Sequence, residues 1–181
     1  MDITAGSRAP GWRRIVAYFI DYVVFILPLL IVLTLAGTAL SSLAVAPTLR
    51  GWTGHSAMLV LLTLPVALYF ALSESSQRKA TVGKRAMKLV VGTPDGEHVS
   101  FGHAFLRAAG KLAPWEFFHA MLWHWEGWPM NPSPATTLQV AGLVFGWAMV
   151  GVYLASLFLG SGRTPYDALA GTSVLYRRPQ A

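Results

Sequence analysis

Cysteine is absent from this chain of 181 residues, and charged side chains are scarce. The absence of cysteine excludes a disulfide scaffold, thiolate metal ligands and thiol catalysis. Charged residues make up 12% of the chain, whereas a soluble domain carries about a quarter. Hydrophobic residues make up 54%, and the mean hydropathy is +0.49. These values indicate an integral membrane protein.

A recognisable set of catalytic or metal-binding residues is also lacking. Gly83-Lys84 has no upstream glycine of the kind that a phosphate-binding loop requires. Glu116 and His119 share a helix face, but a dimetal site in a bundle needs two such pairs and further carboxylates. The tryptophans around this pair favour anchoring at the membrane interface. We therefore expect no enzyme activity, no metal and no cofactor.

Acidic residues are outnumbered by basic ones, 8 to 14, which gives a formal net charge of +6. A basic balance can indicate nucleic-acid binding, but basic residues beside apolar segments are also what membrane orientation requires. We interpret the excess as orientation and expect no nucleic-acid partner.

The apolar runs predict an all-α membrane protein, in which residues 1–181 form a single domain built as a bundle of about four transmembrane helices. The predicted spans are residues 13–40, 57–74, 103–125 and 137–160. The third segment is ambiguous, because charges and Pro114 interrupt it, so it either crosses the membrane or lies on its surface. Arg107 and Lys111 in its first half and the tryptophans at its end favour crossing.

A basic loop over residues 75–102 follows the second span. Its cations are Arg78, Lys79, Lys84, Arg85 and Lys88. Such a loop marks the cytoplasmic side, which predicts a multi-pass protein of the cell (inner) membrane with both termini cytoplasmic. We expect these cations to contact anionic lipid headgroups, with docking of a soluble partner as the alternative. Apolar residues on both sides of Thr93-Pro94-Asp95-Gly96 predict a short β-hairpin in this loop.

The amino-terminal apolar run could instead belong to a secretory signal, because Ala44-Val45-Ala46 resembles a cleavage site. The run is too long for a signal peptide, and Asp21 interrupts it. We favour an uncleaved first span.

Arg14 and Asp21 put two opposite charges into the first span. Seven residues separate them by about 10 Å along one helix face, which is too far for contact. Each charge therefore needs a partner on another element. From depth in the membrane we predict that Arg14 pairs with Asp167, and that Asp21 pairs with Arg107 or Lys111. The pairs either fix the packing of the helices or give Asp21 a role in binding a proton or cation.

Four motifs occur in a characteristic order along the chain. They are Arg14-xx-Ala17-xxx-Asp21; Thr81-Val82-Gly83-Lys84-Arg85 with Lys88-Leu89-Val90-Val91; Ser100-Phe101-Gly102-xx-Phe105-Leu106-Arg107; and Arg163-Thr164-xx-Asp167-xx-Ala170-Gly171-Thr172. With them the chain resembles the RDD family of small membrane proteins over nearly its whole length. The resemblance implies that Arg14, Asp21 and Asp167 are the family triad. Tyr166 stands where the family usually has leucine or histidine.

Two hypotheses on function follow from the resemblance and the charges. In the first, the protein is a small transporter that couples protons to a cation or small solute through Asp21, and its small size then implies a homo-oligomer. In the second, it is a non-transporting scaffold or accessory subunit of a larger membrane complex.

Overall fold

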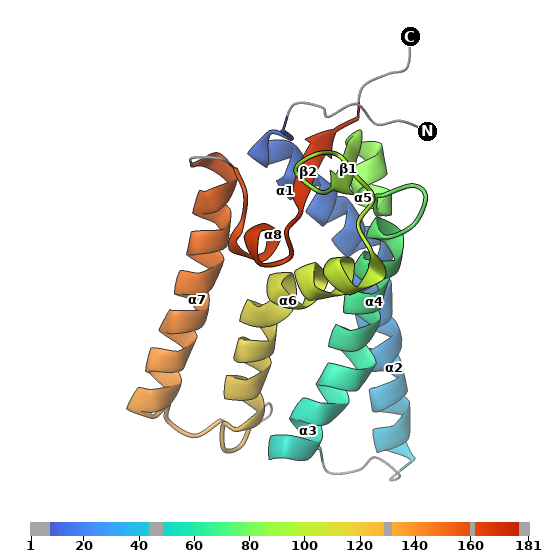
Figure 1. The fold of residues 1–181 in the computed structure, drawn as a ribbon. Helices are drawn as coiled ribbons and strands as arrows, with labels where there is room; N and C mark the ends of the chain where they lie inside the picture. Colours follow the sequence, from blue (N-terminus) through green and yellow to red (C-terminus); the bar gives the residue numbers. More distant parts are fainter. Residues whose placement is uncertain (1–7, 44–48, 129–131, 160–161, 178–181) are drawn as a thin grey trace.

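Long helices form a bundle that is closed at one end by short helices and a small antiparallel sheet (Figure 1). The computed structural model describes residues 8–43, 49–128, 132–159 and 162–177. We call the closed end the capped end; it holds α5, α8, β1 and β2, and the opposite end is the far end. Within the described residues, three helical segments are long and apolar enough to cross a membrane: Gly11–Ser42, Gly51–Glu74 and Thr137–Phe158.

The first two of these segments are continuous helices, each with a π-helical turn. The first consists of α1 (Gly11–Asp21), η1 (Tyr22–Ile26) and α2 (Leu27–Ser42), and the second of α3 (Gly51–Met58), η2 (Leu59–Thr63) and α4 (Leu64–Glu74). Each turn directly precedes a proline at the second position of the next helix, Pro28 or Pro65. A proline has no N–H for the carbonyl four residues back, and a π-helical turn relieves the clash there.

The second segment begins at Gly51, six residues before its predicted start, because its glycines are not turn residues. A Cβ at Gly54 would overlap the ring of Trp123 on α6. The glycine therefore permits close helix packing, and its helical role could not be recognised without knowing the neighbouring helix.

Helix α6 (Phe101–Trp123) bends in its middle and runs from the capped end to the far end (Figure 1). Pro114 leaves the Gly110 carbonyl without its helical donor, and the hydroxyl of Tyr153 on α7 donates to that oxygen at 2.8 Å. At the far end, Trp123 packs over Gly54. Helix α6 thus spans the length of the molecule. It is not one of the three apolar segments named above, because it contains Arg107, Lys111 and Glu116.

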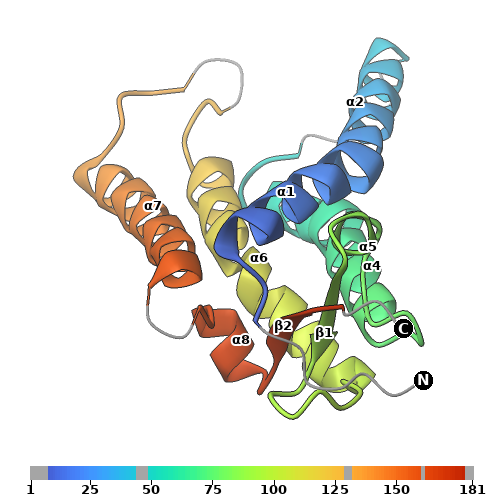
Figure 2. The same cartoon turned by 90° about the horizontal axis from the view of Figure 1, so that it is seen from above.

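Helix α7 (Thr137–Phe158) packs against α6 through two glycines four residues apart. A Cβ at Gly142 would meet Met121 Sδ at 2.5 Å, and one at Gly146 would meet Phe118 Cε1 at 2.6 Å. This small-residue pattern is therefore used inside the chain's own bundle. Seen along the bundle, α7 and α2 lie on opposite sides of it (Figure 2).

The capped end is made of four short elements. They are α5 (Val82–Ala86), β1 (Leu89–Gly92), α8 (Pro165–Leu169) and β2 (Ser173–Tyr176). The strands pair antiparallel, with Leu89 opposite Tyr176 and Gly92 opposite Ser173. Arg8 forms a bridge to Leu175 on the other side of β2, so both ends of the described chain meet here.

The predicted hairpin is wrong in its second strand. The turn exists, since the Gly96 N–H donates to the Thr93 carbonyl at 2.9 Å, but β1 pairs with the distant β2. The predicted second strand is Val99-Ser100-Phe101, but Val99 is instead buried against Ala71 and Ala104. The next residue, Ser100, caps the first turn of α6 through the His103 N–H, which leaves no room for a second local strand.

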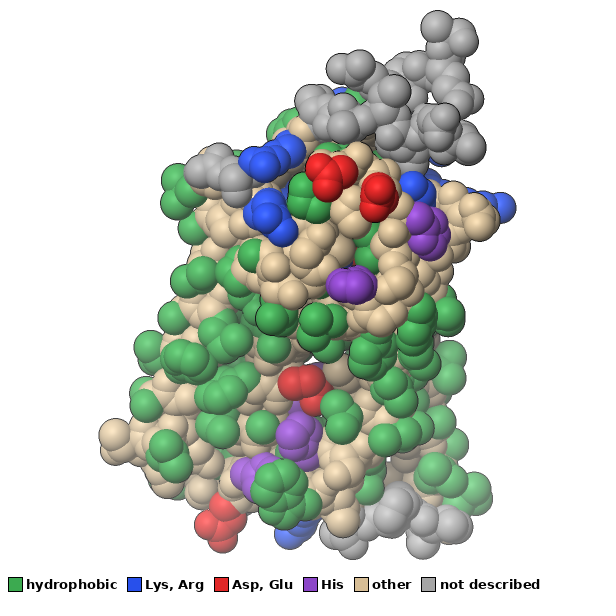
Figure 3. Space-filling model, in the orientation of Figure 1, with side chains coloured by type: hydrophobic (Ala, Val, Ile, Leu, Met, Phe, Trp, Pro, Cys, Tyr) green, Lys and Arg blue, Asp and Glu red, His purple; other side chains and the backbone are tan. Residues whose placement is uncertain are grey.

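Apolar side chains cover most of the body of the molecule, whereas the Lys and Arg side chains on this face lie near the two ends (Figure 3). Helix α2 has no buried residue, and the buried residues of α7 are Gly142 and Gly146. Such surfaces suit a lipid environment. Residues 44–46, considered above as a cleavage site, lie outside the described residues.

Candidate functional site

A network of buried ionisable side chains lies where the capped end meets the long helices. Its carboxylates are Asp21, Glu74 and Asp167, and its cations are Arg14, Lys84 and Arg107. Each carboxylate is at most 1% exposed. Buried charges are costly unless each has partners, so the contacts of each group decide what it can do.

Asp167 lies in the first turn of α8 and accepts from two arginines. Arg14 Nη2 lies 2.5 Å from its Oδ2, and Arg107 Nε lies 2.8 Å from its Oδ1. The carboxylate also accepts from the Thr164 backbone N–H at 3.2 Å, which closes a capping box. Burial by itself would raise the pKa of Asp167, but the arginines outweigh it and hold that pKa well below its usual value. The structure thus brings together Arg14 and Asp167, as depth predicted.

Glu74 ends the second long segment and is the second carboxylate that Arg107 contacts. Arg107 Nη1 lies 2.7 Å from Glu74 Oε2, and Lys84 Nζ also pairs with this carboxylate. Arg107 therefore links α4 to α8 from its place on α6. The sequence interpretation missed Glu74, because a carboxylate at the end of a span is typical of a solvated interface.

Asp21 is held by neutral donors, and its predicted pairing with Arg107 or Lys111 is wrong. Its oxygens accept from the Tyr69 hydroxyl at 2.7 Å, the Thr81 hydroxyl at 2.7 Å and the Gly83 N–H at 2.8 Å. Two of these donors come from the residues that begin α5, which packs onto α1 closely enough that a Cβ at Gly83 would overlap a backbone oxygen of α1. The Thr-Val-Gly motif is thus the partner of Asp21, a contact that depth alone could not reveal.

Lys111 makes no ion pair with any described residue. Its Nζ lies 3.5 Å from the ring centroid of Phe70 and 4.6 Å from that of Tyr18. Aromatic faces stabilise a cation without cancelling its charge. Lys111 is therefore an ionisable group beside the network that has no carboxylate in direct contact among the described residues.

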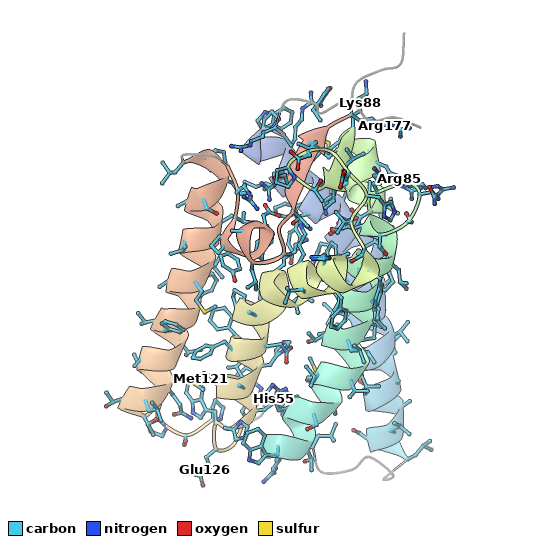
Figure 4. The ribbon with its side chains drawn as sticks, viewed as in Figure 1. His55, Arg85, Lys88, Met121, Glu126 and Arg177 are labelled. Atoms are coloured by element: carbon cyan, nitrogen blue, oxygen red, sulfur yellow. The ribbon has the colours of Figure 1, made fainter. Side chains whose placement is uncertain are left out.

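The five cations predicted to face lipid separate into two groups. Arg78, Arg85 and Lys88 are exposed and Lys79 is half-buried, and Figure 4 shows Arg85 and Lys88 on the outside of the capped end. Lys84 is the exception: it is buried against Glu74. Burial lowers the pKa of Lys84, and the neighbouring Glu74 opposes that shift. The prediction of a lipid-facing Lys84 is wrong because α5 turns it inward.

A cavity of about 280 Å³ opens beside the network, between α1, α6, α7 and α8. Its charged lining residues are Arg14, Asp21, Lys84, Arg107 and Lys111. Its apolar wall includes Phe19 of α1, Trp115 of α6 and Leu154 of α7. The cavity therefore presents charge on one side and hydrocarbon on the other.

A second polar cluster lies between α3 and α6, toward the far end, where Figure 4 shows His55. Glu116 accepts from His119 Nδ1 at 3.0 Å, lies 3.4 Å from His55 Nε2, and accepts from the Thr63 hydroxyl. Among the described residues no group of three or more His, Asp or Glu side chains is arranged to hold a metal ion. The cluster ties α3 to α6, which is more than the interfacial anchoring expected of it.

The sequence matches one known protein family over most of its length. The model of the RDD family matches residues 8–171, which include every residue of the network. No curated protein and no solved structure matches the chain.

Proposed function

This chain belongs to the RDD family, and we propose that it is a four-span transport protein of the cell membrane whose solute site is the cavity beside Lys111. The observation that carries the proposal is the position of Lys111, which lines this cavity and has no ion pair among the described residues. An ionisable side chain within a membrane bundle usually marks a substrate or ion pathway.

Helix α6 supplies the fourth crossing in this proposal. It reaches from Asp167 at the capped end to the start of α3 at the far end, and the bridge between Arg8 and Leu175 is what an even number of crossings requires. The exposed cations of residues 75–102 lie at the same end and favour the cytoplasmic side for it.

Lys111 then binds the solute, and Asp21 couples binding to protons. The cations around the cavity favour an anionic solute over a metal cation. Asp21 accepts from three donors. Protonating it removes its negative charge and turns one oxygen into a donor, so the Thr81 or Tyr69 hydroxyl must turn to accept, and the contact to the Gly83 N–H weakens. Weaker contacts to Thr81 and Gly83 loosen α5 from α1 and open the cavity toward the capped end.

The test is flux into vesicles reconstituted with the purified protein alone. An entrapped pH-sensitive dye reports proton movement while chloride, phosphate or decanesulfonate is added outside, and protein-free vesicles give the background. We expect one of these anions to drive proton flux. Asp21→Asn should abolish the flux, and Lys111→Met should lower it at least tenfold.

Arg78→Gln serves as the matched control, because it removes an exposed cation at the same end of the molecule. Its flux should equal that of the natural chain. Monodisperse protein that moves no anion in any of these vesicles would rule out transport, as would full flux in Lys111→Met.

The second candidate function is that of a scaffold or accessory subunit. It is favoured by the complete hydrogen bonding of the Asp21 carboxylate. Three donors already satisfy this carboxylate. A carboxylate with these contacts can have a purely structural role, which is to hold α5 against α1. The outer face of α7 carries Gly151, with nothing within 4 Å of an added Cβ, and this face suits close approach by another membrane helix. A silent preparation that co-purifies with a stoichiometric partner, or as a stable homo-oligomer, favours this function.

A further inference from the structure

We propose that the cavity takes an anionic amphiphile from the bilayer, with its carboxylate or phosphate on Lys111 and its acyl chain between α1 and α7. The proposal rests on the assignment of the cavity as the solute site, and it names the class of that solute. Charge, the composition of the wall and the position of the opening each support it.

The charge balance leaves room for a single anion. Among the described residues of the network and cavity there are four cations, Arg14, Lys84, Arg107 and Lys111, and three carboxylates, Asp21, Glu74 and Asp167. Arg14, Lys84 and Arg107 each contact a carboxylate. A ligand with one negative charge would therefore neutralise Lys111 and break no existing pair.

The wall of the cavity suits hydrocarbon. Ile15, Phe19, Val150, Leu154 and Leu157 line it together with Trp115. Even the contacts of Lys111 itself are the faces of aromatic rings. A small hydrated anion would leave this wall in contact with water, whereas an acyl chain would cover it with hydrocarbon.

The opening lies on the side of the molecule that faces lipid. Phe19 is 64% exposed, Trp115 46% and Leu154 48%, although all three line the cavity. Helix α7, which forms one edge, has no charged residue between Thr137 and Phe158. An amphiphile can therefore enter sideways from the bilayer, with no need to pass through water.

Binding is tested on the full chain in a non-ionic detergent, with dansyl-undecanoic acid as the fluorescent probe. We expect saturable binding that oleate or phosphatidate displaces and that decanol or inorganic phosphate does not. Displacement by oleate names a fatty acid as the source of the anion, and displacement by phosphatidate names a phospholipid. Equal displacement by decanol, or displacement by phosphate alone, overturns the proposal.

Two variants separate the head from the tail of the ligand. Lys111→Met should weaken probe binding at least tenfold, and Lys111→Arg should restore most of it. Leu154→Trp keeps the charge but fills the apolar side, and it should also weaken binding at least tenfold. Arg78→Gln is the control for charge, with unchanged binding. Full binding in both Lys111→Met and Leu154→Trp overturns the proposal.

The two proposals fail in distinguishable ways. Anion flux that depends on Lys111, without binding of the fluorescent acid, would refute the amphiphile and keep transport. Binding that depends on Lys111, without flux in vesicles, would refute transport and leave a lipid site.

Discussion

The capped end and the outer helices α2 and α7 differ in what surrounds their side chains. At the capped end, Asp21, Glu74, Arg107 and Asp167 are all buried, and each has at least two polar partners. Helix α2 buries no residue at all, and α7 buries two glycines. One region is ordered by contacts within the protein, while the other leaves most of its surface to lipid.

The difference shows where the specificity of this fold resides. An apolar side chain has nearly the same free energy in lipid as against another apolar helix. Burial between helices therefore contributes little to their arrangement in a membrane. A buried carboxylate tolerates few alternatives, because losing its partner leaves a desolvated charge. The network at the capped end therefore fixes how α1, α4 and α6 meet.

The largest effect is expected at Arg107, the side chain shared by two carboxylates. Arg107→Met leaves Glu74 without one partner and Asp167 without another, and removing one member of a buried pair costs about 3–5 kcal/mol. Thermal unfolding of the purified variant in detergent, followed by tryptophan fluorescence, measures the loss. Arg78→Gln should stay within about 0.5 kcal/mol of the natural chain. An equally stable Arg107→Met would mean that the network does not order the capped end.

Acid should weaken the contact between Arg107 and Asp167 by protonating Asp167. The effect should be smaller than that of Arg107→Met, because Glu74 keeps its arginine. Since its arginines hold the pKa of Asp167 below the usual value, the carboxylate stabilises the fold above its unfolded pKa of about 4. That stability is lost as the pH falls through the folded pKa. Melting temperatures between pH 5 and pH 2 should decline in the natural chain and decline less in Asp167→Asn. Parallel curves for the two proteins would contradict the assignment.

The smallest effect is expected from a matched pair of glycines, one in each region. Gly83→Ala pushes a methyl group into a backbone oxygen of α1 and should destabilise the fold by about 1–3 kcal/mol. Gly151→Ala meets nothing within 4 Å, and alanine is the better helix former by up to about 1 kcal/mol. It should leave stability unchanged or slightly raised. Comparable losses in both variants, measured by thermal unfolding, would show that the outer helices are as constrained as the capped end.

Much of the helical architecture could be predicted from the chain itself. The spans 13–40, 103–125 and 137–160 lie within three residues of α1–α2, α6 and α7 at either end, because long apolar runs and N-caps such as Ser100 and Thr136 are local signals. The hairpin was mispredicted since the partner of β1 lies more than eighty residues away. No local pattern near Gly92 distinguishes a distant strand from a near one.

The candidate site divides in the same way. Depth in the membrane was enough to pair Arg14 with Asp167, because Arg14 lies at the entry of the first span and Asp167 just beyond the end of the last, both near the same interface. It failed for Asp21, whose donors include a backbone N–H and two hydroxyls that carry no charge to attract notice. Nothing in the sequence indicated that Glu74 and Lys84 are buried, because both are typical of an exposed interface until α5 turns Lys84 toward Glu74.

Composition and motifs are enough to identify this chain as a membrane protein of the RDD family, with long apolar helices, prolines within them and a few charges at one end. Those properties depend on composition and local spacing. The tertiary structure alone decided which charge is cancelled and which is left over. Ion pairing depends on distances of a few ångströms between segments remote in sequence. For this reason Asp21 is held by neutral donors, and Lys111 lines the cavity with no ion pair among the described residues.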